Sequence, residues 1–311
     1  MTEASADTDG TATAVARAGP TGWRSIVRFP LVAMILALTG FALLIAAASF
    51  VITAALPPAL PEAASLAIDG IVTPLAAILA YKLVIPRLGE SPRDDLPLDR
   101  RLVDLGRGTL LALLLMSLIV GVTMLLGGYR IAGWGGSTSW AVILFLAGTQ
   151  AAVVEEILFR GILFRFLEEF GGSWFALALS AAVFGALHAF NDNATVLSSV
   201  AIAVEAGVLL GGAYMLTRDL WLAIGIHFGW NVTQGYLWDV SVSGFAVDGL
   251  VEAYPQGAEL ISGGAFGLEA SLAAMVLATS CGIWLVARAV RRGLVVRPWW
   301  VRRRLGLALP A

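Results

Sequence analysis

The sequence predicts an all-α fold, a polytopic integral membrane helical bundle of about eight transmembrane helices. Hydrophobic residues make up 59% of the 311 residues and the mean hydropathy is +0.85, whereas about half of the residues in a soluble domain are apolar. Apolar runs recur at the length of about 18 residues or more that a helix needs to cross a bilayer. A membrane β-barrel would instead show alternating segments of about ten residues, so the sequence excludes it.

The N-terminal part is expected to hold a tail and three membrane helices. Residues 1–28 begin with a small, polar, low-complexity run and predict a disordered cytoplasmic tail. Residues 29–138 contain the first three helices, at about 30–56, 63–86 and 108–128. A charged cytoplasmic loop punctuated by proline, residues 87–107, separates the second of these helices from the third.

The C-terminal part predicts a membrane core, a loop and a last helix. Residues 139–240 form the core, with helices at about 139–168, 173–190, 194–216 and 220–239. Residues 241–265 are an acidic, glycine-rich extracytoplasmic loop, and 266–311 hold the last helix, at about 266–287, and a basic cytoplasmic tail. Within the core, Gly171 and Gly172 signal a helix end, and Gly207-x-x-x-Gly211 has the spacing that lets two helices approach closely.

The distribution of basic residues predicts the orientation. With the N-terminus inside, every lysine and arginine except Arg130 falls on the cytoplasmic side of these helices, as the positive-inside rule requires. We therefore expect a multi-pass protein of the cell (plasma) membrane with both termini cytoplasmic. Cys281 is the single cysteine, so there is no disulfide framework and no cysteine-based metal site.

Ionisable residues inside the apolar runs are the main functional signal, because each costs several kcal/mol unless it is paired or faces a wet cavity. Glu156 and Arg160 are four residues apart, with the acid first, which favours an ion pair within one helix. Glu155 projects about 100° away and has no local partner, which suits a general base or acid. The alternative is a structural ion pair, with Glu155 bonded to a neighbouring helix.

Three further polar residues lie on two other helices of the core. His188 ends the fifth predicted helix, and His227 and Asn231 are one turn apart on the seventh, so they share a face. A lone membrane histidine is more often a hydrogen bonder between helices than a catalyst, and that alternative stays open for His188. Glu205 lies in the middle of the sixth helix, where bonding between helices is its expected role and membership of a site is the alternative.

These motifs resemble a known family. Glu155-Glu156-x-x-x-Arg160, Phe184-x-x-x-His188 and His227-x-x-x-Asn231, each on its own helix, look like the CAAX prenyl protease and bacteriocin-processing family of intramembrane endopeptidases, over about residues 140–240. The resemblance implies that 139–240 is the catalytic core. It also implies that Glu155 and His188 activate a water, that His227 and Asn231 stabilise the oxyanion, and that Glu156 and Arg160 order the site.

The resemblance leaves the metal open. The family is often described as metalloproteases, and Glu155, His188 and His227 would form a set of two histidines and one carboxylate for Zn²⁺ with an open position. The same groups would equally run a metal-free glutamate mechanism.

The function expected is an intramembrane endopeptidase that hydrolyses a peptide bond in a membrane-associated protein or peptide. Its partners would be the lipid bilayer and this substrate, with no nucleic acid. One alternative is a catalytically silent membrane scaffold or immunity protein with the same motifs. The other is a proton-coupled transporter that uses the glutamates and histidines as a relay, although we find no inverted repeat in the sequence.

Overall fold

The computed structural model describes residues 22–90, 93–99 and 101–309. The prediction of an all-α membrane bundle is confirmed, and the chain is a multi-pass membrane protein. Six helices in the described part are long and apolar enough to cross a membrane by length and composition: Pro30–Ala55, Glu62–Arg87, Arg101–Leu125, Val142–Gly171, Val196–Thr217 and Leu272–Arg291. The fifth and seventh predicted helices are also present but shorter, as α7 (Ser173–His188) and α9 (Trp221–Val232).

The N-terminal helices form a hairpin on one side of the molecule. Of the predicted tail, residues 1–21 lie outside the described residues, whereas Trp23–Arg28 form the short helix α1 rather than disordered chain. The hairpin consists of α2 (Pro30–Ala55) and α3 (Glu62–Val84), the latter extended by the short 3₁₀ helix η1 (Ile85–Arg87). Pro30 begins α2 because a proline at the first helical position needs no hydrogen-bond acceptor.

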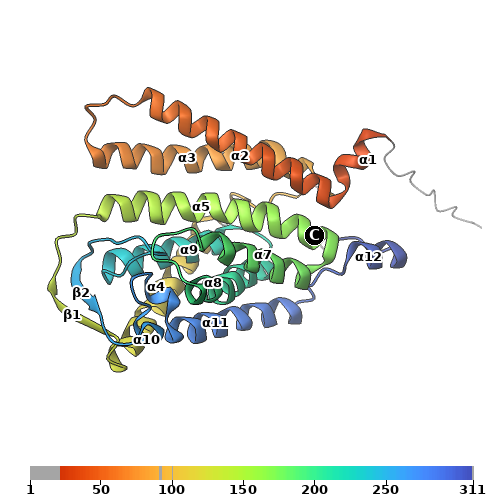
Figure 1. Cartoon of the computed structure of the whole chain (residues 1–311). Coiled ribbons are helices and arrows are strands. Elements are labelled where there is room, and N and C mark those ends of the chain that lie inside the picture. Colours follow the sequence, from red (N-terminus) through yellow and green to blue (C-terminus); the bar gives the residue numbers. More distant parts are fainter. Residues whose placement is uncertain (1–21, 91–92, 100, 310–311) are drawn as a thin grey trace, which may run out of the picture.

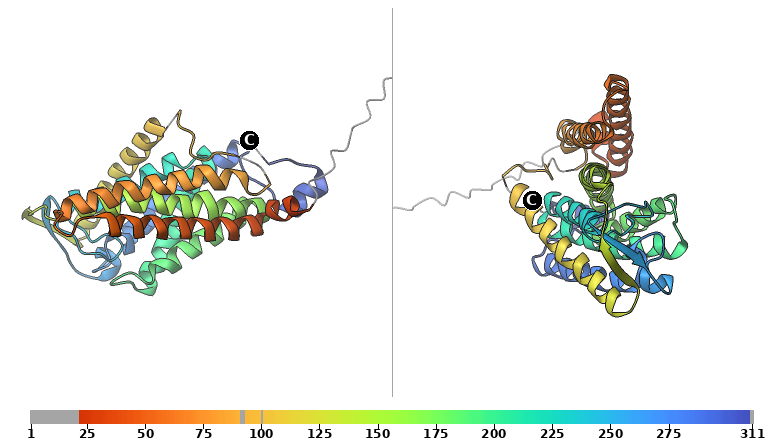
Figure 2. Two further views of the ribbon diagram at one scale, coloured as in Figure 1. Left: turned by 90° about the horizontal axis from the view of Figure 1, so that it is seen from above. Right: turned by 90° about the vertical axis from the view of Figure 1, so that its left-hand side faces the viewer.

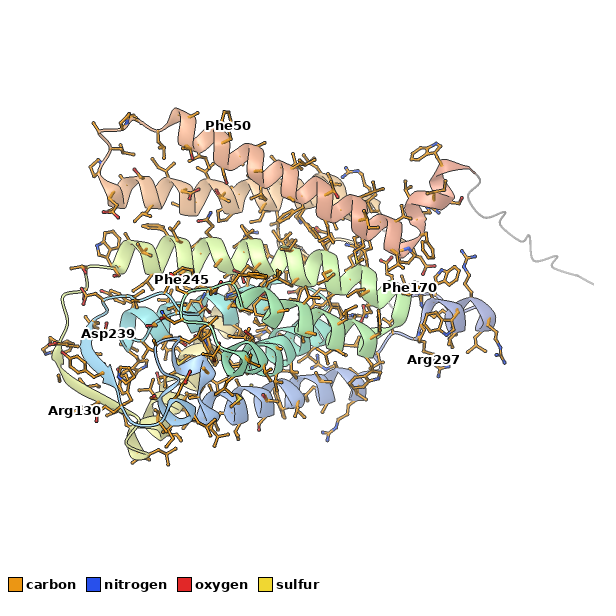
Figure 3. All side chains as sticks on the ribbon, in the orientation of Figure 1. Phe50, Arg130, Phe170, Asp239, Phe245 and Arg297 are labelled. Atoms are coloured by element: carbon orange, nitrogen blue, oxygen red, sulfur yellow. The ribbon has the colours of Figure 1, made fainter. Side chains whose placement is uncertain are left out.

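The long fourth helix joins the hairpin to the rest of the bundle (Figures 1 and 2). Gly70 of α3 makes this contact close, because a Cβ at that position would lie 2.5 Å from the carbonyl oxygen of Phe145. The other side of the hairpin carries large exposed apolar side chains such as Phe50, labelled in Figure 3. Such a surface is what a lipid-facing helix presents.

The fourth helix is continuous but changes its winding. It consists of η2 (Val142–Gln150), α5 (Ala151–Glu156), η3 (Ile157–Phe164) and α6 (Arg165–Gly171), in which η2 and η3 are π-helical. We call Val142–Gly171 the α5 helix. It ends where predicted, at Gly172, whose φ of 84° favours glycine. Wider π-helical turns often accompany functional sites, and here they flank the Glu155-Glu156 pair.

The third helix starts earlier than predicted. Helix α4 (Arg101–Leu125) begins inside the segment 87–107 that we assigned to a loop. Hydropathy marks only the apolar part of a helix, and the first turn of α4 is polar and carries Asp104, a favourable place for an acid. The loop that remains is well packed, with Asp95 and Leu96 fully buried.

The remaining helices complete the core around the α5 helix. They are α8 (Val196–Thr217), α11 (Leu272–Arg291) and the short α10 (Glu259–Ser262) and α12 (Trp299–Leu305), with a π-helical turn η4 (Thr233–Leu237) after α9 and a 3₁₀ turn η5 (Leu268–Ala270) before α11. The predicted small-residue contact exists: a Cβ on Gly207 would lie 2.5 Å from the Cβ of Ala181, so α7 and α8 touch. Gly225 similarly brings α9 against the backbone of Leu105 in α4.

A small sheet was not predicted. Strand β1 (Tyr129–Trp134) pairs antiparallel with β2 (Val251–Pro255), and the register shifts between Ile131 and Gly133. It lies at one end of the bundle, which we call the sheet end, and α1 and α12 lie at the other, which we call the tail end (Figure 1). Figure 3 shows Arg130 and Asp239 at the sheet end and Arg297 at the tail end.

Candidate active site

One or two residues from each of the three motifs line one groove. Glu155 of α5, His188 at the end of α7, and His227 and Asn231 of α9 surround a volume of about 620 Å³. The rest of the lining is mostly apolar and comes from the α5 helix, from α7 and from the loop that follows η4. That loop includes Phe245, which Figure 3 shows near the α5 helix. The three helices thus bring together residues that are distant in sequence.

Glu156 and Arg160 form the predicted ion pair. The Glu156 Oε1 atom accepts a hydrogen bond of 2.8 Å from Arg160 Nη1, and both side chains are buried. The same oxygen lies 2.9 Å from His227 Nδ1. Arg160 also donates to the carbonyl of Ala206 and lies 4.8 Å from the ring centroid of Phe184. Glu156 therefore links the α5 helix to α9 and fixes the His227 ring.

Glu155 is the carboxylate left without an arginine. Its Oε2 atom is buried, has no hydrogen-bond partner among the described residues, and lies 4.0 Å from His227 Nε2. The side chain as a whole is 32% exposed and faces the groove. A gap of this length between an acceptor and a ring nitrogen fits a bridging water or a substrate group rather than a direct bond.

Hydrogen bonds to the Nδ1 atoms define what each histidine offers to the groove. Because the Phe184 carbonyl can only accept, His188 Nδ1–H donates to it at 2.8 Å, and a neutral ring then presents Nε2 as an acceptor. His227 Nδ1–H donates to the Glu156 carboxylate. His227 Nε2 therefore donates only when the ring carries both protons.

Phe184 packs near both histidines. Its ring centroid is 4.5 Å from that of His188 and 6.4 Å from that of His227, and the Phe159 ring packs edge-on against it at 4.7 Å. The sequence motif includes Phe184, but the sequence did not give it a role. In the structure it contacts both imidazoles and covers the buried guanidinium of Arg160.

Asn231 is oriented by the backbone of the α5 helix. Its Nδ2 atom donates a hydrogen bond of 2.7 Å to the carbonyl oxygen of Ala147. An amide nitrogen has two hydrogens, so one remains for a ligand in the groove. This contact joins the third motif to the helix that carries the first.

Glu205 is close to this site but does not line the groove. It is 1% exposed, and neither of its carboxylate oxygens has a hydrogen-bond partner among the described residues, so the expected bond between helices is not seen. It shares a second, smaller cavity with Glu269, which we did not predict as a site residue. Glu269 accepts hydrogen bonds of 3.0 Å from the backbone N–H and hydroxyl of Ser243, and burial raises its pKa to about 7.

The three residues predicted as zinc ligands, Glu155, His188 and His227, all line the groove. Among the described residues, no group of three or more His, Cys, Asp and Glu side chains is arranged to hold a metal ion. The Nδ1 atoms of both histidines are already engaged by Phe184 and Glu156. The zinc site therefore stays a prediction, and no chemical step is built on it below.

Comparison with known proteins agrees with the motifs. A family model described as "Type II CAAX prenyl endopeptidase Rce1-like" matches residues 137–233, which include all seven motif residues. Comparisons with curated proteins and with solved structures gave no match. Residues 137–233 are similar to the Rce1-like family of type II CAAX prenyl endopeptidases.

Proposed function

We propose that the protein is an intramembrane endopeptidase that hydrolyses a peptide bond in a membrane-associated protein or peptide, with a water activated by Glu155 and His188. The observation that carries this proposal is the unpartnered Glu155 Oε2, which faces the groove shared by His188, His227 and Asn231. A buried carboxylate oxygen without a hydrogen-bond partner destabilises the fold. Such an oxygen is typical of a functional group that gains its hydrogen-bond partner only when the substrate is bound.

Glu155 is the proposed base. It removes a proton from the water that attacks the scissile carbonyl and returns the proton to the leaving nitrogen, as amide hydrolysis requires. His188 offers Nε2 as an acceptor for the same water, since its Nδ1–H is held by Phe184. Glu155 and His188 belong to different helices, so the water would be oriented by side chains from two helices.

His227 and Asn231 are the proposed oxyanion donors. Asn231 has one free N–H after bonding to Ala147, and His227 donates through Nε2 when protonated. The carboxylates of Glu155 and Glu156 lie next to that ring, so its positive charge has opposite charges beside it. Removing a single oxyanion donor typically lowers kcat by about 10²–10³-fold.

The groove indicates an apolar substrate. Its lining includes Leu146, Leu158, Phe159, Leu187 and Phe245, and its volume accommodates several side chains of an extended peptide. Helical peptide bonds are shielded by their own hydrogen bonds. We therefore expect a short, apolar, locally unwound segment as the substrate, such as a small membrane-associated peptide.

The test compares wild type with Glu155→Gln in detergent, using cleavage of a peptide library read by mass spectrometry. We expect Glu155→Gln to lower kcat by at least about 10³-fold, close to 4 kcal/mol of transition-state stabilisation, with an unchanged melting temperature because Glu155 has no hydrogen-bond partner to lose among the described residues. Glu62→Gln, an exposed acid at the start of α3, is the control and should cleave as wild type does.

A chelator added to the same assay tests the zinc prediction separately. Full activity in the chelator supports the metal-free glutamate mechanism, and a loss restored by Zn²⁺ supports a metal site. If folded wild-type protein cleaves none of the peptides, the result contradicts the endopeptidase proposal and favours a catalytically silent scaffold.

A further inference from the structure

A second polar cavity lies behind the groove. It is lined by apolar side chains of α8, α9 and α11 and by two carboxyl groups, those of Glu205 and Glu269. We call it the rear cavity. It has a volume of about 30 Å³, and a water molecule needs roughly 10–15 Å³. The rear cavity is therefore large enough for one or two waters and too small for a peptide side chain of any length.

Glu205 lacks partners in this cavity. Both of its oxygens are buried and have no hydrogen-bond partner among the described residues, and the side chain is 1% exposed. Whether the carboxyl group is charged or neutral, it keeps hydrogen-bonding capacity that the apolar neighbours Ile202, Leu209 and Ala278 cannot meet. Buried polar groups of this kind are normally satisfied by ordered water.

The cavity offers enough polar groups to hold water. Glu269 and Ser243 lie on its wall together with Glu205, and they are already connected by two hydrogen bonds of 3.0 Å. A buried water typically makes about three hydrogen bonds. Glu205 alone supplies two free acceptor oxygens, and the Ser243–Glu269 pair supplies further acceptors. The second N–H of Asn231, which also lines the cavity, is available as a donor.

The rear cavity and the groove share part of their walls. His188, His227, Asn231 and Ser243 line both. Every turnover of a hydrolase consumes one water molecule. When an apolar peptide fills a groove inside a bilayer, little bulk water can reach the groove to replace the water molecule that was consumed. A polar cavity directly behind the histidines is therefore well placed to supply that water.

We propose that the rear cavity is a water-binding site in which Glu205, with Ser243 and Glu269, holds ordered water and delivers it to the groove between His188 and His227. This proposal rests on the proposed hydrolysis for its role, but not for the presence of water. Glu205 acts here as a positioning residue and does not touch the substrate.

The first test is a structure of the wild-type protein, crystallised from lipid at a resolution that shows ordered water elsewhere in its interior. We expect at least one water within hydrogen-bond distance of a Glu205 carboxylate oxygen. A dry cavity would overturn the proposal, whether or not the protein cleaves peptides, so this result is separate from the failure of the Glu155 experiment.

The second test uses two substitutions at Glu205. Glu205→Met is similar in length but cannot bind water, and we expect an empty cavity and a kcat at least about tenfold lower, with KM within about twofold of wild type. Glu205→Gln can still bind water, and we expect it to keep the water and at least about a third of the wild-type kcat. A Glu205→Met protein with wild-type kcat would overturn the role in supply.

The control is Thr123→Val, which removes a buried hydroxyl that, like the Glu205 carboxylate, lacks a hydrogen-bond partner among the described residues. Thr123 does not line either cavity. Its kcat and KM should match wild type. If Glu205→Met does not fold, the water seen in wild type and in Glu205→Gln, with the kcat of the latter, still decides the proposal: two dry cavities overturn it and two occupied cavities support it.

Discussion

Two buried clusters of charged residues lie in this bundle, and they are built in opposite ways. The cluster at the tail end, which we call the tail-end network, matches each of its acids with an arginine. The cluster around the groove and the rear cavity leaves several acids without one. Since both are buried in the same fold, the difference indicates which of them serves stability and which serves chemistry.

In the tail-end network, each acid lies within ion-pair distance of an arginine. Asp95 contacts Arg93 at 2.8 Å and Arg165 at 3.1 Å, and its Oδ2 atom also accepts from two tyrosine hydroxyls. Glu168 accepts two hydrogen bonds of 2.9 Å from Arg218 and one of 2.6 Å from a serine hydroxyl. Loop 93–99, the end of the α5 helix and the end of α8 are held together in this way.

The groove and rear cavity are open by comparison. Glu156 has Arg160, whereas Glu155 has only His227, with 4.0 Å between the nearest nitrogen and oxygen. For Glu205 and Glu269, no basic side chain lies within ion-pair distance among the described residues. An excess of buried acid is unfavourable unless water, protons or a substrate compensate for it, so this is where we place the chemistry.

The largest change in stability is expected for Asp95→Asn in the tail-end network. Removing the charge leaves the two buried guanidinium groups of Arg93 and Arg165 partly uncompensated, and we expect the free energy of unfolding to fall by about 3–5 kcal/mol. Unfolding by SDS in mixed micelles measures it. The folded fraction should keep the wild-type kcat, the reverse of what we expect for Glu155→Gln.

Asp94→Asn is the matched control for Asp95→Asn. Asp94 is the neighbouring residue, is about 43% exposed and pairs with Lys82 near the surface, so the change should cost less than about 1 kcal/mol. Equal destabilisation by both substitutions would mean that burial of the network does not determine its contribution.

The second prediction concerns the pH dependence of Glu269. Its carboxyl has a pKa of about 7 instead of 4.5, because burial disfavours the charged form, while Glu205 and His227 lie close enough to act on it. Because the pKa of Glu269 is higher in the folded state than in the unfolded state, Glu269 contributes to the free energy of unfolding. This contribution is fully present below about pH 4.5 and is lost as the pH rises through 7. Between pH 5 and 8, we expect the free energy of unfolding of wild type to fall by about 3 kcal/mol relative to that of Glu269→Gln.

The measurement is SDS unfolding of both proteins across that pH range, with Glu259→Gln as the control from an exposed position in the same segment of the chain. The Glu259→Gln curve should run parallel to that of wild type. A parallel curve for Glu269→Gln as well would show that Glu269 does not titrate in this range.

The smallest effect is expected for Arg302→Ala in α12. Arg302 is buried and donates hydrogen bonds of 2.6 Å to both the Glu169 carbonyl and Glu90 Oε2. Losing these bonds should cost about 2 kcal/mol and detach α12 from the α5 helix, which limited proteolysis of the tail would detect. Arg304→Ala, exposed on the same helix, should change neither readout.

The sequence was sufficient for the helices and for the motif residues. The apolar runs placed all eight helices within a few residues, apart from the earlier start of α4 and the later start of α11. The Glu156–Arg160 pair follows from helical spacing, and the structure contains it. These features are local, and local spacing is what a sequence shows most directly.

The features that the sequence did not predict depend on distant contacts. Glu269 follows a glycine-rich loop without any pattern that links it to Glu205, and only the packing of α8 against α11 brings the two together. Likewise, β1 and β2 are short segments whose pairing depends on the fold of the helices between them. The role of Phe184 depends on three neighbours from three helices.

The pairing of β1 with β2 has a consequence for the order in which this protein matures. Strand β1 precedes residues 137–233 and β2 follows them, about 120 residues later in the chain. At a synthesis rate of about 5–20 residues per second, β1 exists for roughly 5–20 s before its partner. The loop that carries Ser243 and Phe245 is also late in the chain. The growing chain thus contains all the motif residues, up to Asn231, before β2 has been synthesised.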